Sequence, residues 1–90
     1  MDKKVLVINN DNDMLHNYYM EKPKDVQIYT YGIENNSDFM AEDIVLSENK
    51  SRFVCNFKGD KFEVTVPVGG IHFVYNALCA CCWEFIKFKY

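Results

Sequence analysis

The sequence predicts a mixed α/β fold, an α+β arrangement with a mixed sheet, in which a βαβ unit precedes an antiparallel meander and a C-terminal helix. Three observations support this prediction. The continuous apolar run Val5–Ile8 is typical of a strand in a parallel sheet. Two alternating runs flank the turn residues Lys58–Asp60, which indicates a β-hairpin. After the glycine pair Gly69–Gly70, apolar residues recur at helical spacing.

Composition limits the classes of protein that the chain can represent. Its 90 residues suggest one small domain or part of a larger one. With 49% hydrophobic and 16% aromatic residues, the chain can bury a core and is not disordered. A formal net charge of -3 without a Lys/Arg cluster argues against nonspecific nucleic-acid binding. The run Val5–Ile8 is too short for a signal or membrane segment, so we expect a cytoplasmic protein.

The first third of the chain predicts the βαβ unit. The run Val5–Ile8 is expected to form a strand that is buried on both faces. Asp11 or Asn12 then caps a short helix over about residues 13–20, in which His16 is expected to face solvent. The β-branched and aromatic run Val26–Tyr31 forms the second strand.

The remainder predicts an antiparallel meander and a helix. Residues 38–47 are expected to be extended, and Pro67 places the last strand at an edge of the sheet. The helix begins after Gly70, and the tail Trp83–Tyr90 fits either more helix or an alternating strand. One face of the hairpin is expected to be buried against the Ile71–Phe85 helix, and its residues are Phe53, Cys55, Phe57, Phe62, Val64 and Val66.

Two groups of residues raise the question of a metal site. Cys79, Cys81 and Cys82 fall on the predicted helix, where small core residues are favoured over a metal or redox role. The acidic run that begins at Asp11 resembles the start of a calcium loop. However, His16 and Lys22 occupy the positions that require Gly and Glu. We therefore predict no metal site and no catalytic residue.

His72 and Asn76 are the polar residues that interrupt the last helix. Their spacing of four places both on one helix face. An asparagine on an apolar helix face needs a partner, and its amide offers a donor and an acceptor together, as the edge of an adenine requires. The pattern alone leaves a structural hydrogen bond and a nucleotide contact both open.

The stretch Gly69–Ala80, GGIHFVYNALCA, resembles the G-x-H-N-x-x-N-A-L-A-A segment of the Mur ligases, which are ATP-dependent amide-forming enzymes of peptidoglycan precursor synthesis. Three further segments resemble the same family. They are Val5–Asp11 as the strand ending in N-x-D, Ser37–Ile44 as S-D-F-x-A-x-x-I, and Phe62–Gly70 as the strand before the helix. The tail Trp83–Tyr90 does not resemble the family.

The resemblance implies specific roles. Asn76 matches the family asparagine that contacts the adenine of ATP, His72 matches the motif histidine, and Asn9 and Asp11 match the N-x-D at the strand end. Phe73 stands where the motif has its first asparagine. The S-D-F-x-A segment and His72 are most similar to the member that adds D-alanyl-D-alanine to UDP-N-acetylmuramoyl-tripeptide. The member that adds the third residue is the competing assignment.

The chain lacks the G-x-x-x-x-G-K-[ST] phosphate loop and an acidic set for Mg²⁺, which belong to the parent enzyme. We therefore expect residues 1–90 to be a single partial domain, the second half of a Mur ligase ATP-binding central domain, inactive alone and weak in ATP binding. The alternative is a small standalone protein-interaction module. Because the run Val5–Ile8 and the tail leave apolar surface uncovered, we also expect a homodimer.

Overall fold

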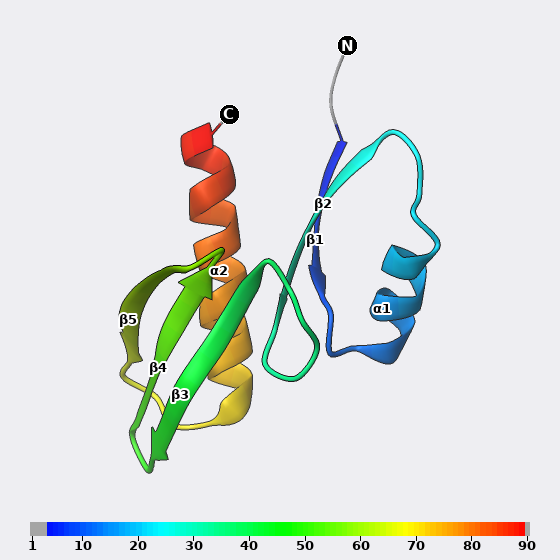
Figure 1. Cartoon of the computed structure of the whole chain (residues 1–90). Helices are drawn as coiled ribbons and strands as arrows, with labels where there is room; N and C mark the ends of the chain where they lie inside the picture. The colour runs from blue at the N-terminus through cyan, green and yellow to red at the C-terminus, as the bar shows by residue number, and fades with distance from the viewer. Residues whose placement is uncertain (1–3, 90) are drawn as a thin grey trace.

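The computed structural model describes residues 4–89, which form five strands and two helices (Figure 1). In chain order these are β1 (Lys4–Asn9), α1 (Asp13–Met20), β2 (Val26–Gly32), β3 (Phe39–Ser47), β4 (Lys50–Phe57), β5 (Asp60–Val66) and α2 (Ile71–Lys89). The predicted βαβ unit, meander and C-terminal helix are all confirmed.

The five strands form one mixed sheet in the order β1-β2-β3-β4-β5. β1, β2 and β3 are parallel, whereas β3, β4 and β5 are antiparallel. The parallel and antiparallel parts are joined by a short ladder, in which Tyr31 pairs with Phe39 and Gly32 pairs with Met40. β1 and β5 are the edge strands, as Pro67 predicted for the last strand.

The helix α2 packs across the sheet and closes the core. It buries one residue per turn, at a spacing of four: Val74, Leu78, Cys82 and Ile86. Ile86 continues this buried row beyond Trp83, which explains why residues 83–89 of the tail are helix and not strand, while Tyr90 lies outside the described residues. Opposite the helix, the sheet contributes Tyr29, Phe39, Ala41, Phe53 and Cys55 to the same core.

The hairpin turn has the conformation that its residues predict. Lys58 and Gly59 both have positive φ, at 50° and 93°, as a two-residue type I′ turn requires. The register pairs Phe53 with Val64 and Cys55 with Phe62, so the predicted hairpin face exists. Phe62 on the edge strand is 47% exposed, however, because α2 covers β5 only in part.

The expectation that β1 is buried on both faces is wrong. Val5 and Val7 pack against the core beneath α2, but on the opposite face only Ile8 is buried and Leu6 is 38% exposed. The helix on that side, α1, has eight residues and buries none of them. It lies beside β1 on the side away from α2 (Figure 1). An edge strand beneath so short a helix stays partly open.

The start of α2 is fixed by two glycines and a buried serine. A Cβ at Gly69 would collide with the carbonyl oxygens of Ser47 and Glu48, and Gly70 has a φ of 140°. The Ser51 hydroxyl has no exposed surface, donates to the Val68 carbonyl at 2.7 Å and accepts the Gly70 N–H at 3.1 Å. This clasp determines where the first turn of α2, which carries His72, lies.

Candidate functional site

The carboxylate of Asp11 is the centre of a polar network at the carboxyl end of β1. It accepts the backbone N–H groups of Ile33 at 2.7 Å, Glu34 at 3.1 Å and Asn35 at 2.8 Å. It also accepts the hydroxyl of Tyr75 at 2.7 Å. The loop after β1, the loop after β2 and helix α2 are therefore joined through one side chain.

Burial alone would raise the pKa of Asp11, but the N–H groups of Asn35 and Ile33, the hydroxyl of Tyr75 and the N–H of Glu34 outweigh burial, so its pKa is lowered. The hydrogen bond between Tyr75 and Asp11 also changes the pKa of Tyr75. Burial, together with the hydrogen bond to Asp11, raises the pKa of Tyr75 to about 12. At neutral pH the pair is therefore a carboxylate that accepts from a neutral phenol.

Asn10 lies between the predicted residues Asn9 and Asp11 and is almost fully buried, with 2% of its surface exposed. Its amide donates to the Asn36 carbonyl at 3.0 Å, and its side-chain oxygen is 2.8 Å from Nδ1 of His16. The expectation that His16 faces solvent is therefore wrong. It is half-buried because it satisfies the amide oxygen of Asn10.

Asn9 and Asn12 shape the loop around Asp11. The side-chain oxygen of Asn9 accepts the N–H of Asp11 at 2.9 Å. That of Asn12 accepts the N–H of Leu15 at 3.0 Å, so Asn12 is the cap of α1, one of the two predicted candidates. Both side-chain oxygens thus accept a hydrogen bond from a nearby backbone N–H, as asparagine commonly does in turns.

His72 and Asn76 lie on the outer face of α2 and are both exposed. Each is two residues from the buried Val74, which is about 200° of rotation on an α-helix, so both point away from the core. The His72 ring lies 4.4 Å from the ring of Phe73. Asn76 therefore needs no internal partner, contrary to what the apolar surroundings in the sequence suggested.

The predicted pair Asn9 and Asp11 is connected to the predicted pair His72 and Asn76 by a residue that the sequence did not predict. Tyr75 immediately precedes Asn76, and its hydroxyl reaches Asp11 across 64 sequence positions. The carboxyl end of β1 and the amino end of α2 lie at the same end of the molecule (Figure 1). No local pattern in the sequence signals this contact, since a tyrosine at a helical core spacing is ordinarily a packing residue.

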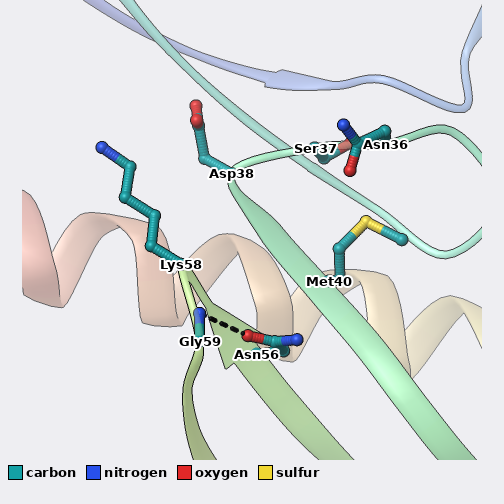
Figure 2. Close-up of a pocket in the computed structure, with 7 residues that line it drawn as sticks. All are labelled: Asn36, Ser37, Asp38, Met40, Asn56, Lys58 and Gly59. Atoms are coloured by element: carbon teal, nitrogen blue, oxygen red, sulfur yellow. Dashed lines mark hydrogen bonds between the residues drawn. The ribbon is translucent and has the colours of Figure 1, made fainter.

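A separate polar hollow of about 270 Å³ lies where the start of β3 meets the β4–β5 turn. Figure 2 shows the side chains of Lys58 and Asp38 extending toward the same side of this hollow, while Asn56 binds the N–H of Gly59. Asp38 already accepts the N–H of Thr30 at 3.0 Å. None of the four predicted site residues lines this hollow.

Cys55 and Cys82 have no exposed surface and belong to the core, as predicted, whereas Cys79 and Cys81 are half-buried, and all four are free thiols. Within residues 4–89, no group of three or more His, Cys, Asp or Glu side chains is arranged to hold a metal ion. Neither described helix is long and apolar enough to span a membrane.

The exposed residues of this arrangement are suited to binding a ligand. The exposed imidazole of His72 and the exposed amide of Asn76 stand one turn apart in the first two turns of α2. Asp11 has its acceptor positions filled by four donors, so it holds the loops in place and is not a free base. These groups can recognise a planar polar ligand at the surface.

Residues 1–83 match the family described as the Mur ligase middle domain. A UDP-N-acetylmuramate--L-alanine ligase from Dechloromonas aromatica is 35% identical over 79 residues, which is 84% of this chain and 17% of that protein. A UDP-N-acetylmuramoyl-L-alanyl-D-glutamate--2,6-diaminopimelate ligase from Bacillus velezensis is 43% identical over 63 residues, 69% of this chain and 13% of that protein.

A solved structure of MurF from Acinetobacter baumannii superposes with a TM-score of 0.79 and 24% identity, over 94% of this chain and 18% of that one. At this identity the likeness establishes the fold alone. The chain thus spans less than a fifth of the proteins that it matches.

Proposed function

The chain belongs to the Mur ligase family, and from that premise we propose that it forms the adenine end of the nucleotide site in an ATP-dependent ligase of peptidoglycan precursor synthesis. The observation that carries the proposal is the exposed pair His72 and Asn76, one helical turn apart on α2, beside the bond between Tyr75 and Asp11. In the sequence, His72, Asn76 and Asp11 resemble the family motifs, whereas Tyr75 falls at an unspecified motif position.

We divide the four proposed cofactor-binding residues into two roles. Asn76 has an unengaged amide on the surface, which fits the donor and acceptor pair on an adenine edge, and the His72 ring lies on the same face. Asn9 and Asp11 have their polar atoms engaged with backbone, so they hold the loop that borders the base. ATP, when bound, supplies the phosphoryl group that activates a carboxylate.

The phosphates and Mg²⁺ belong to a part of the enzyme that this sequence does not contain, since its 90 residues include no G-x-x-x-x-G-K-[ST] loop. We therefore propose that the chain alone does not hydrolyse ATP and binds it in the millimolar range. One amide contributes a few hydrogen bonds of about 1 kcal/mol each. We also propose a cytoplasmic location, where nucleotide-linked precursors are made.

The test is a titration of the ¹⁵N-labelled chain with ATP to about 10 mM, which reaches the affinity range expected for one or two polar contacts. Shifts should concentrate at residues 72–76 and at Asn9 and Asp11, and Asn76→Ala should remove them. Asn17→Ala, an exposed asparagine on α1, is the matched control. Shifts spread evenly over the molecule, or micromolar affinity by calorimetry, would contradict the proposal.

For the substrate we propose D-alanyl-D-alanine and a UDP-N-acetylmuramoyl-tripeptide, supported by the S-D-F-x-A segment at Ser37–Ala41 and by His72. Addition of L-alanine to UDP-N-acetylmuramate is the second candidate, because the Dechloromonas aromatica relative is named for it. ADP release by a full-length ligase carrying this segment, offered each amine with its acceptor, decides between the two.

The other class of function is a standalone interaction module, and either class is compatible with self-association. The edge strand β1 leaves Leu6 38% exposed, and Phe88 on the last turn of α2 is 95% exposed. We propose that the chain dimerises through these surfaces. Sedimentation of the chain at about 0.1 mM, well above a micromolar dissociation constant, that reports only monomer would remove this proposal.

A further inference from the structure

Phe73 departs from the family motif at the nucleotide site, because it stands where that motif has an asparagine. Its side chain is half-buried in the first turn of α2. Within residues 4–89, the partly buried apolar residues that pack against the core include Ala77 and Phe85 of the same helix but not Phe73. Packing against the core therefore does not account for an aromatic side chain at this position.

The ring of Phe73 lies against its neighbours at the start of α2. Its centroid is 4.4 Å from that of the exposed His72 ring, with an angle of 38° between the two planes. Its Cδ2 atom lies close to Gly70, where an added Cβ would approach it to 3.3 Å. The two rings therefore form an adjoining aromatic pair at the surface, and the missing side chain of Gly70 leaves room for that pair.

Asn76 lies beside both rings, because residues three and four positions apart are neighbours on the surface of a helix. His72, Phe73 and Asn76 therefore form one surface patch on the first two turns of α2. Ala80, one turn further along the helix, is exposed and adds only a methyl group. None of these four residues is Asp, Glu, Lys or Arg, so the patch suits a neutral planar group, such as a base, better than a phosphate.

A stacked ring and a side-chain amide recognise different parts of a base. Every base has a π-face, so stacking on an aromatic ring adds affinity without reading the groups on the edge of the base. The exposed Asn76 amide presents a donor and an acceptor, which pair with the amino group and N1 of adenine. Turned over, the same amide pairs with O6 and the N1–H of guanine. One mobile amide beside an aromatic pair therefore selects a class of base and not a single base.

Building on the nucleotide function proposed above, we infer that the base stacks on the ring pair of His72 and Phe73, and that Asn76 pairs with the edge of the base. Phe73 is then the residue that sets the specificity of the site. The larger π-face of a purine gains more from stacking than that of a pyrimidine, so the site accepts purine nucleotides as a class. Adenine and guanine nucleotides bind with similar affinity, and pyrimidine nucleotides bind more weakly.

The experiment titrates the isotope-labelled chain with AMP, GMP and CMP and follows the backbone and aromatic resonances by NMR. The three nucleotides carry the same phosphate, so differences between them report the base. The ring protons of Phe73 and His72 should shift upfield, because a stacked base adds its ring current. The dissociation constants for AMP and GMP should agree within about threefold, and that for CMP should be about fivefold higher than that for AMP.

Variants at position 73 separate stacking from a structural role. Phe73→Leu keeps an apolar side chain without a ring. It should weaken AMP and GMP binding about fivefold, to the level of CMP, so that the preference for purines is lost. Phe73→Tyr keeps the ring and should keep both the affinity and the preference. Phe88→Leu makes the same exchange at a 95% exposed position on the last turn of α2, and it should change neither.

The outcomes distinguish this inference from the function on which it rests. If no nucleotide shifts the resonances of residues 72–76, the nucleotide site itself is refuted. If AMP shifts these backbone resonances but leaves the Phe73 ring protons unmoved, only the stacking is overturned. Equal affinities for AMP and CMP, or a purine preference that survives Phe73→Leu, also overturn it. If Phe73→Leu unfolds the chain, the ring shifts of the wild type and the Phe73→Tyr variant still decide the outcome.

Discussion

The antiparallel half of the molecule and its parallel half bury different kinds of groups. Strands β3 and β4 with α2 supply most of the apolar core, including Phe53, Val74 and Leu78, all with no exposed surface. The β1–α1–β2 half adds few core residues and leaves Met14 on α1 79% exposed. Its loops are held instead by hydrogen bonds to Asp11.

The comparison teaches where stability and binding reside. Apolar burial of the antiparallel half stabilises the fold as a whole, whereas the polar half fixes the geometry of particular loops. Substitutions in the antiparallel half should therefore change the free energy of global unfolding. Substitutions in the β1–α1–β2 half should change the order of particular loops. The following predictions sharpen or break this division, beginning with the largest effect.

The largest effect is expected for Phe53→Ala. Phe53 is fully buried between β4 and α2, so its loss should lower the free energy of unfolding by about 3–5 kcal/mol, measured by urea titration. Phe62→Ala, on the neighbouring strand but 47% exposed, is the matched control and should cost at most about 1.5 kcal/mol. Equal losses at the two positions would show that the core does not lie where we place it.

Asp11→Asn should cost about 1–3 kcal/mol, because an amide cannot accept four donors and presents hydrogens to the N–H groups of residues 33–35. Amide hydrogen exchange should accelerate at residues 33–35 and not at the core strands. Asp13→Asn, in the exposed first turn of α1, should cost less than about 1 kcal/mol. Faster exchange throughout the sheet would mean that the two halves unfold as one unit.

The pH dependence of the unfolding free energy should show the contribution of the Asp11 carboxylate. Because the pKa of Asp11 is lowered in the folded state, its contribution is complete above the unfolded value of 3.8. It is lost as the pH falls from about 4 through the lower folded pKa. The difference in unfolding free energy between the wild type and Asp11→Asn should therefore shrink as the pH falls below about 4. A difference that stays constant over this range would refute the assignment.

Tyr75→Phe removes the single hydroxyl that joins α2 to Asp11, and should cost about 0.5–1.5 kcal/mol in thermal or urea unfolding. Tyr18→Phe on α1, where the side chain is 40% exposed, should change stability by less than about 0.5 kcal/mol. If both variants match the wild type, the contact between Tyr75 and Asp11 contributes nothing in solution.

The smallest effect is expected for His72→Ala and Asn76→Ala. Both side chains face solvent, so the unfolding free energy should change by less than about 0.5 kcal/mol. A substantially destabilised Asn76→Ala would mean that the amide has an internal partner and is not reserved for a ligand.

The sequence predicted the elements well because each has a strong local signal. The helix over residues 13–20, the glycine-containing hairpin turn and the glycine-led start of α2 are all determined by neighbours in the chain. The exposure of Phe62 and Leu6 was not predictable, because alternation says which face a residue takes and not how far a helix covers that face.

The candidate site was predicted only in part, for a similar reason. His72 and Asn76 were placed on one helix face by spacing alone, but the direction of that face depends on which row is buried. The bonds from Tyr75 to Asp11 and from His16 to Asn10 join segments that no periodicity relates. The family resemblance supplied the candidate residues, and the structure adds the network that holds them.

The two-residue ladder between β2 and β3 has a mechanical consequence. This ladder has only two residue pairs, Tyr31–Phe39 and Gly32–Met40, and is therefore the shortest ladder among the described strands. It joins the parallel half of the sheet to the antiparallel half. Few backbone hydrogen bonds therefore resist bending at this junction, and its stiffness comes from α2, which packs against β1 and β2 on one side and against β3 and β4 on the other. The hydroxyl of Tyr75 on Asp11 ties the amino end of α2 to the loop after β1 and adds a polar connection across the same junction.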